Sequence, residues 1–200
     1  MPKNHFDAKK HEYTSDGKRL ISVTECLDLL DDFSFVDPDV LKKKGTRGTN
    51  VHNMVAKFED GTLQMHKLTE SMKKLLKQYL FFRKQYADIF TGKIKIETPI
   101  YNPLLGLAGT PDILTPRIFT DIKTRPIHRI RDCLQMAGYE IALGHKKERD
   151  YYVLELAEDK FKFTKVYYKN AKAIFLKLLK HKKERVDLIN FCKHEEQRGK

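Results

Sequence analysis

Apolar residues recur with the period of an α-helix in five parts of the chain. Ser22 and Glu25 have the spacing of a capping box, which predicts that a first helix begins after Ser22. Further helices are predicted over 51–58, about 69–90, 130–143 and from Asn170 onward. The lysine-rich stretch 42–49 contains two glycines, and we expect it to form a basic turn between the first two helices.

The period of the apolar positions changes to two in the middle of the chain. Residues 94–100 alternate between apolar and polar side chains, which predicts a half-buried strand. Strands are also predicted over 107–114 and 118–124, so that the three form an antiparallel meander, and two later strands over 151–156 and 160–167. This order of elements predicts an α+β fold with a central mixed β-sheet flanked by helices.

The length of the chain suits one domain. A chain of 200 residues with 40% hydrophobic residues can fill one core, and a second domain of ordinary size is not expected. Residues 1–20 are polar and basic, and we expect them to be an irregular segment ahead of a single domain that spans residues 21–200.

The charge of the chain points to a polyanionic partner. Its 39 Lys and Arg residues exceed its 27 Asp and Glu residues, which gives a net charge of +12 and makes nucleic acid the leading partner class. The three cysteines are scattered, and no stretch has the pattern of a signal peptide or a membrane span. We therefore expect an intracellular protein with no membrane partner.

Two carboxylates and a lysine are grouped by the predicted hairpin. Asp121 and Lys123 are two residues apart on one strand and so share a face, and the hairpin brings Asp112 alongside them. Gly109 and Pro111 are expected to constrain the backbone before Asp112. These carboxylates, with the backbone carbonyl of Ile122, are ligands that Mg²⁺ or Mn²⁺ prefers. For these residues alone, a solvated hairpin with alternating charges is the competing interpretation.

Four short motifs occur in a fixed order around this hairpin. They are Gly48-Thr49-Asn50-Val51-His52, Gly109-Thr110-Pro111-Asp112, Asp121-Ile122-Lys123-Thr124 and Gln135-Met136-Ala137-Gly138-Tyr139. Together they resemble the PD-(D/E)xK nuclease superfamily and, within it, the RecB-like exonuclease branch, over residues 48–139. The resemblance implies a restriction-endonuclease-like core and metal-dependent hydrolysis of DNA phosphodiester bonds.

The resemblance also implies roles for individual residues. The catalytic residues would be Asp112, Asp121, Lys123, Gln135 and Tyr139, and the metal ligands His52, Asp112, Asp121 and the carbonyl of Ile122. Expected DNA contacts are Lys42, Lys43, Lys44, Arg47, Thr49, Thr124, Arg125, Gln135 and Tyr139. Glu59 and Glu97 are further carboxylates that either enter a second metal site or are solvated.

The resemblance leaves the details of the activity open. It favours an exonuclease that uses Mg²⁺ or Mn²⁺ in DNA recombination, repair or end processing, as a stand-alone enzyme of phage type. A structure-selective endonuclease, a non-catalytic DNA-binding module and an RNA-binding protein are the alternatives. No iron-sulfur cluster is expected from three scattered cysteines, and no nucleotide cofactor, because the chain has no phosphate-binding loop motif. The partners would be DNA ends or single strands, with a recombinase, a single-strand-binding protein or further copies of the chain left open. The location would be a bacterial or host cytoplasm, with an organelle also left open.

Overall fold

The computed structural model describes residues 2–8, 10–30, 38–144 and 149–198. Within these ranges the protein combines helices with two five-stranded sheets, which confirms the α+β class with mixed sheets flanked by helices. The helices are α1 (Val23–Leu27), α2 (Pro38–Glu59), α3 (Glu70–Gln85), α4 (Arg129–Leu143) and α5 (Ala171–Arg198). The strands are β1 (Asn4–Asp7), β2 (Glu12–Ser15), β3 (Lys18–Ser22), β4 (Lys95–Ile96), β5 (Ile100–Asn102), β6 (Leu107–Gly109), β7 (Ile113–Leu114), β8 (Ile118–Lys123), β9 (Asp150–Leu156) and β10 (Phe161–Val166).

One sheet has the order β10-β9-β8-β7-β4, and the other has the order β1-β2-β3-β6-β5. In the first sheet β8 and β9 are parallel, with Asp121 opposite Val153, and the helix α4 forms the connection between these two strands. In the second sheet the parallel pair is β3 and β6. All other neighbouring strands are antiparallel.

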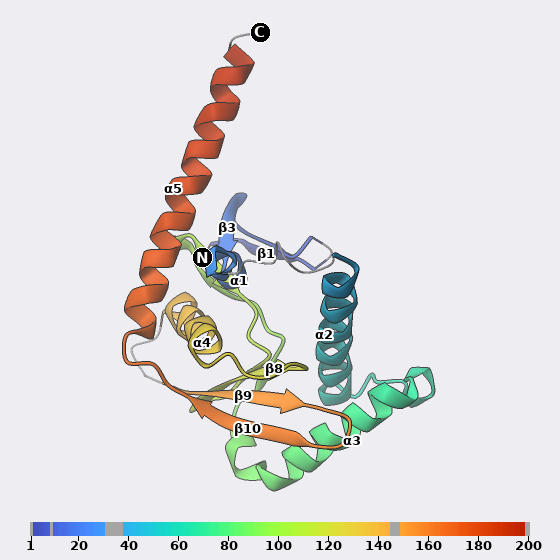
Figure 1. Ribbon diagram of the computed structural model, residues 1–200. Coiled ribbons are helices and arrows are strands. Elements are labelled where there is room, and N and C mark those ends of the chain that lie inside the picture. Colours follow the sequence, from blue (N-terminus) through green and yellow to red (C-terminus); the bar gives the residue numbers. More distant parts are fainter. Residues whose placement is uncertain (1, 9, 31–37, 145–148, 199–200) are drawn as a thin grey trace.

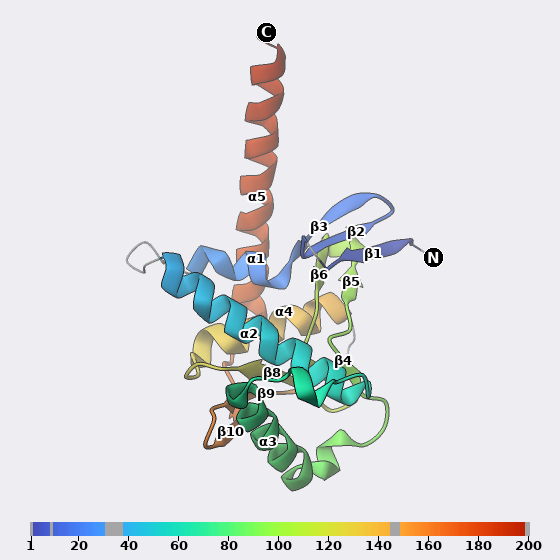
Figure 2. The ribbon, with the colours of Figure 1, turned by 90° about the vertical axis from the view of Figure 1, so that its right-hand side faces the viewer.

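Helices cover both faces of the sheet that contains β8. Figure 1 shows α4 on one face of β8, β9 and β10 and α3 on the other, with α2 beside the end of β8. Along β8, Phe119 belongs to the core beneath α4, whereas Ile122 belongs to the core against α2 and α3. The predicted alternation is therefore correct: Ile122 points into a core, and Asp121 and Lys123 share the opposite face, toward α4. In Figures 1 and 2, α5 packs on this body with its first turns and extends away from it.

The predicted meander is divided between the two sheets. The expected strand 94–100 breaks into β4 and β5 at Glu97, whose φ is +42°, and the expected strand 107–114 breaks into β6 and β7. Because β4 pairs with β7 and β5 pairs with β6, the two segments form one antiparallel ribbon that bends between the sheets. The backbone N–H of Glu97 donates to the carbonyl of Asp112 at 3.0 Å across this bend. Only β4, β7 and β8 remain as a meander in one sheet.

The predicted basic turn over 42–49 is wrong, because these residues are helical and belong to α2. Gly45 and Gly48 have open space around them, so they cost the helix only about 1 kcal/mol each in propensity. That cost is offset where α2 buries Val51, Met54 and Val55 in the core. Pro38 stands at the first helical position, where a missing N–H does no harm.

The expectation of an irregular N-terminal segment is also wrong. Asp16 and Gly17 both have positive φ, and they connect β2 to β3 by a two-residue turn of the kind that favours a hairpin. Tyr13 and Leu20 are buried in a small core with Ala108. The N-terminal strands are thus continuous with the sheet that contains β5 and β6.

The remaining sequence predictions differ from the structure only in detail. Ser22 caps α1 and forms the expected capping box with Glu25. Thr69 caps α3, which ends at Gln85 and is followed by a 3₁₀ turn over Ala87–Phe90. The three cysteines are free thiols, and two of them, Cys26 and Cys133, are buried. Over the ranges the structure describes, none of the helices has the length and apolarity needed to span a bilayer.

Candidate metal and active site

The bend of the β4–β7 ribbon places two carboxylates at the point where the sheets meet. Asp112 directly precedes β7 and is buried, and Glu97 directly follows β4 and is partly exposed. Pro111 precedes Asp112 and has no N–H to donate to a sheet, which suits the break between β6 and β7. The bend thus brings Glu97 and Asp112 to the same side of the ribbon.

His52 joins these two carboxylates to strand β8. Its side chain projects from α2, and its Nδ1 lies 3.1 Å from Glu97 Oε1 and 3.1 Å from Asp112 Oδ1. Its Nε2 lies 3.1 Å from the carbonyl oxygen of Ile122. Because the neighbours of both ring nitrogens are acceptors, the ring is best satisfied as an imidazolium that donates from both.

The ligand atoms of His52, Glu97 and Asp112 all lie within 4.8 Å of one another. A nitrogen and several carboxylate oxygens at this spacing can hold a divalent cation. The carbonyl of Ile122 faces the same histidine and supplies a further oxygen. The sequence prediction of His52, Asp112 and Ile122 as neighbours is consistent with this geometry, and the structure adds Glu97.

Asp121 lies beside this cluster on β8. Its side chain is 1% exposed, and neither carboxylate oxygen has a hydrogen bond with acceptable geometry to any described residue. The ammonium of Lys123 lies 2.6 Å from Oδ2, so an ion pair is the partner that this carboxylate has. A buried carboxylate with so little hydrogen bonding is costly, and a cation bound between Asp121 and Asp112 would reduce that cost.

Asp112 is fixed by the backbone of β8. Its Oδ2 accepts a hydrogen bond from the N–H of Ile122, and its Oδ1 faces His52. Burial alone would raise the pKa of Asp112, but the neighbouring charges of His52 and Lys123 lower it below the usual value. Asp112 is therefore ionised at neutral pH.

The pKa values of the other titratable groups, Asp121, Glu97 and His52, are raised. Burial raises the pKa of Asp121 to about 6; Lys123 opposes this shift and the nearby Asp112 adds to it. Burial also raises the pKa of Glu97, partly against the effect of His52. For His52, burial alone would lower the pKa, but the carboxylates of Asp112 and Glu97 hold it well above the usual value. The site therefore gathers three carboxyl groups in a buried place and retains a proton on His52.

A chain of hydrogen bonds runs from Lys123 into helix α4. Lys123 Nζ donates to Gln135 Oε1 at 3.1 Å, and Gln135 Nε2 donates to the Tyr139 hydroxyl at 3.0 Å. Gln135 and Tyr139 are four residues apart on α4 and so lie on one face, as expected. Both side chains are buried, which favours a role in orienting Lys123 over direct contact with DNA.

Gly109 allows this chain to pack against the ribbon. A Cβ at this position would lie 2.8 Å from Tyr139 Cε1 and 3.1 Å from Val23 Cγ2. Residue 109 has no positive φ, so the glycine is needed for the close approach of a ring. The constraint expected at Gly109 is therefore one of space, and not one of backbone conformation.

The predicted DNA contacts are distributed over several surfaces. Lys43 and Arg47 are exposed on α2, and Arg47 lies 3.9 Å from Glu158. The Thr49 hydroxyl donates to the carbonyl of Gly45 within the helix, and Thr124 is half-buried. The side chains of Lys42 and Lys44 lie outside the described residues. Each of these residues stays a prediction as a DNA contact.

Arg125 has a structural partner in the described region. Its guanidinium pairs with the buried carboxylate of Asp132, which also accepts the backbone N–H of His128 at the start of α4. This arrangement fixes the loop between β8 and α4. Its contact with DNA stays a prediction beside that structural role.

Sequence reasoning left Glu97 open, either as a ligand of a second metal site or as a solvated side chain. In a strand of alternating residues it has the pattern of a solvated side chain, but in the structure its φ is +42° and its carboxylate contacts His52. The signal that could have favoured the ligand role is its place opposite Asp112 in a predicted hairpin. Glu59, the other carboxylate considered, is instead engaged by Arg83 at 2.8 Å and by the hydroxyl of Tyr79 at 2.7 Å.

Comparisons with known proteins give a limited result. No protein-family model and no curated protein matches the chain. Among solved structures, the chain is similar to one described as the crystal structure of LHK-Exo in complex with dAMP. The similarity has a TM-score of 0.48 and 15% sequence identity, and it covers 90% of this chain and 95% of that chain.

Proposed function

We propose that this protein is a divalent-metal-dependent deoxyribonuclease, and specifically an exonuclease that hydrolyses phosphodiester bonds from DNA ends. The observation that carries the proposal is the buried Asp121 carboxylate, which among the described residues has the Lys123 ammonium as its polar partner and lies next to the His52–Glu97–Asp112 cluster. The net charge of +12 attracts a polyanion to the protein, but the carboxylates of this site repel phosphate groups. A cation bound to the carboxylates would remove that repulsion.

The residues present fit a hard divalent cation. His52, Asp112, Asp121 and the carbonyl of Ile122 would hold it, and Glu97 adds a carboxylate. A bound Mg²⁺ or Mn²⁺ supplies Lewis-acid polarisation of a phosphate and a water of lowered pKa. The proton that His52 retains between Glu97 and Asp112 must leave for this nitrogen to act as a ligand, because metal ligands bind in the deprotonated form.

Lys123 would be the catalytic residue that acts on the phosphate. Its ammonium is 15% exposed and is held between Asp121 and Gln135, so it is fixed in position and still reaches the surface of the site. There it would orient the attacking water and offset the charge that develops on the phosphate oxygens. Gln135 and Tyr139 would be positioning residues, because they act on Lys123 through the hydrogen bonds that hold it.

The finer assignments are supported by the sequence motifs alone. The resemblance of these motifs to the RecB-like exonuclease branch favours an exonuclease in DNA recombination, repair or end processing over a structure-selective endonuclease. The same proposal includes Mg²⁺ or Mn²⁺ as the metal and no requirement for an iron-sulfur cluster or a nucleotide cofactor. It also includes cooperation with a recombinase or a single-strand-binding protein.

The test uses linear DNA labelled at one end and covalently closed circular DNA of the same sequence. We expect loss of the linear substrate in Mg²⁺ or Mn²⁺, no loss in EDTA and an intact circle. Asp112→Asn and Lys123→Ala should abolish the cleavage, whereas Asp150→Asn, which changes an exposed carboxylate at the start of β9, should not. Cleavage of the circle would replace the exonuclease with an endonuclease. DNA binding without cleavage of either substrate would refute the nuclease proposal.

A further inference from the structure

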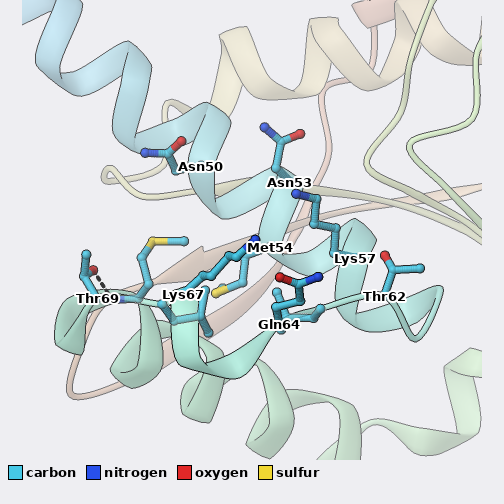
Figure 3. A pocket seen from close by; sticks show the side chains of 11 residues that line it. Asn50, Asn53, Met54, Lys57, Thr62, Gln64, Lys67 and Thr69 are labelled. Carbon is cyan, nitrogen blue, oxygen red and sulfur yellow. Dashed lines mark hydrogen bonds between the residues drawn. The ribbon is translucent and has the colours of Figure 1, made fainter.

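A groove separate from the acidic site lies between α2 and the segment that leads from α2 to α3. Its volume is about 420 Å³, which is within the range of about 300–1,000 Å³ typical of ligand pockets. Figure 3 shows Asn50, Asn53 and Lys57 on α2, with Gln64 and Lys67 on the opposite segment. The remaining lining residues are Met54, Thr62, Leu63, Leu68, Thr69 and Met72.

The lining of this groove combines two kinds of surface. Met54 is buried, and Leu63, Leu68 and Met72 are half-buried, so they form an apolar floor. Asn50, Asn53 and Gln64 are exposed around it, and their amide groups offer both donors and acceptors. An apolar floor with an amide rim can pack against a flat ring and hydrogen bond to its edge.

The charged residues that line the groove are all basic. Lys57 and Lys67 are both exposed, neither forms an ion pair among the described residues, and none of the lining residues is acidic. The nearest carboxylate in sequence, Asp60, accepts hydrogen bonds from the backbone N–H and the hydroxyl of Thr62, and it interacts with Lys57 through charge but forms no ion pair with it. Two exposed ammonium groups beside an apolar floor fit a ligand that has a flat apolar ring and an anionic group.

The position of the groove relates it to the candidate active site. Asn53 directly follows His52, and Lys57 lies five residues after His52 on the same helix, or about 7.5 Å along its axis. At about 100° per residue, the α2 residues that line the groove lie roughly 100–160° around the helix from His52, so the groove and the acidic site occupy different faces of α2. The groove can therefore hold a unit of a bound strand and not the scissile phosphate itself.

We propose that this groove binds one nucleotide unit of a single-stranded DNA segment that extends beyond the acidic site. The base would lie on the floor formed by Met54, Leu63 and Met72, the amides of Asn53 and Gln64 would bind its edge, and Lys57 and Lys67 would bind the adjoining phosphate. This inference rests on the proposed nuclease function for its substrate, and it identifies a binding site that is separate from the acidic cluster.

The test measures binding of a fluorescent single-stranded oligonucleotide in EDTA, where no cleavage occurs. We compare Lys57→Ala/Lys67→Ala with Lys84→Ala/Lys177→Ala, a control that removes two exposed lysines outside the groove and so lowers the net charge from +12 by the same two units. We expect the groove variant to bind at least about 10-fold more weakly than the control. The dependence of log K on log salt should become shallower by about 1.4, because two phosphate contacts to a single strand are lost.

Two further arms separate the explanations. Asn53→Ala and Gln64→Ala should weaken binding of the oligonucleotide and leave binding of an abasic oligonucleotide of equal length unchanged. Excess free dTMP should compete only weakly; strong competition would mean that the groove binds free nucleotides and would overturn the strand assignment. Equal affinities and equal salt slopes for the groove and control variants would also overturn it. Because binding is measured without a catalytic metal, a wild-type protein that binds but never cleaves would refute the nuclease function and leave the groove assignment standing.

Discussion

Replacing Asp121 by asparagine should make the metal-free protein more stable. The Asp121 side chain is buried, its oxygens lack hydrogen bonds to described residues, and burial raises its pKa from 3.8 to about 6. A shift of about two units corresponds to about 3 kcal/mol, which is the destabilisation caused by ionised Asp121 when the pH lies above both values. Asp121→Asn removes this charge and should raise the free energy of unfolding by up to about 3 kcal/mol at pH 8.

The sign of the pH dependence follows from the raised pKa. The folded state holds its proton on Asp121 more tightly than the unfolded state does, so the wild type loses stability as the pH rises from 3.8 through about 6. The advantage of Asp121→Asn should therefore be largest at pH 8, fall to about half at pH 5 and nearly vanish below pH 3.8.

The assay is urea unfolding of both proteins in EDTA at pH 8 and pH 5, followed by thermal scans at pH 8 in EDTA and with Mn²⁺. In EDTA, a gain of about 3 kcal/mol corresponds to a melting temperature higher by roughly 6–12 °C for a chain of this size. Saturating Mn²⁺ should stabilise the wild type by about 2.7 kcal/mol at 100 times its Kd, and the variant much less. An Asp121→Asn protein that is less stable than the wild type in EDTA, or that gains as much from Mn²⁺, would refute this reasoning.

Three other changes test separate parts of the account. Gly109→Ala places a methyl group 2.8 Å from Tyr139 Cε1, so it should lower the free energy of unfolding in urea by about 1–3 kcal/mol. Because it displaces the Tyr139–Gln135–Lys123 chain, it should also lower kcat more than it raises KM. Unchanged stability would contradict the packing argument. Glu97→Gln should weaken Mn²⁺ binding by at least about 10-fold in a calorimetric titration, and wild-type affinity would show that Glu97 is not a ligand. Burial alone would raise the pKa of Glu25, but hydrogen bonds from the Ser22 backbone and from Arg19 lower the pKa overall. Ionised Glu25 therefore stabilises the fold above pH 4.5, and this stabilisation is lost as the pH falls through the lowered pKa. Glu25→Gln should therefore cost about 0.5–1 kcal/mol at pH 7 and almost nothing at pH 2.5, and an equal cost at both values would contradict the linkage.

The sequence predicts those features that depend on local periodicity. The alternation along β8 correctly places Ile122 in a core and puts Asp121 and Lys123 on the opposite face. The spacing of Gln135 and Tyr139 correctly predicts that both lie on one face of α4, where they hydrogen bond to each other. In both cases a single element determines the relation between the side chains, so periodicity is sufficient.

The features that the sequence did not predict depend on contacts between elements. The positive φ of Glu97 is stabilised by pairing across a bent ribbon, which an alternating pattern cannot reveal. The helical state of residues 42–49 results from the burial of the second half of α2, which outweighs the unfavourable propensity of Gly45 and Gly48. The N-terminal hairpin did leave a local signal, the Asp16–Gly17 pair, but its strands are short and gain their core by packing on Ala108 and Tyr101 of the neighbouring strands.

The central claim is that His52, Glu97, Asp112 and Asp121 together hold a divalent cation. The most direct measurement is a calorimetric titration of Mn²⁺ into the metal-free wild type and into Asp112→Asn, with Asp150→Asn as the control. The account predicts saturable binding to the wild type and to the control, and no measurable binding to Asp112→Asn. Equal binding of Mn²⁺ by all three proteins, or by none of them, would contradict it.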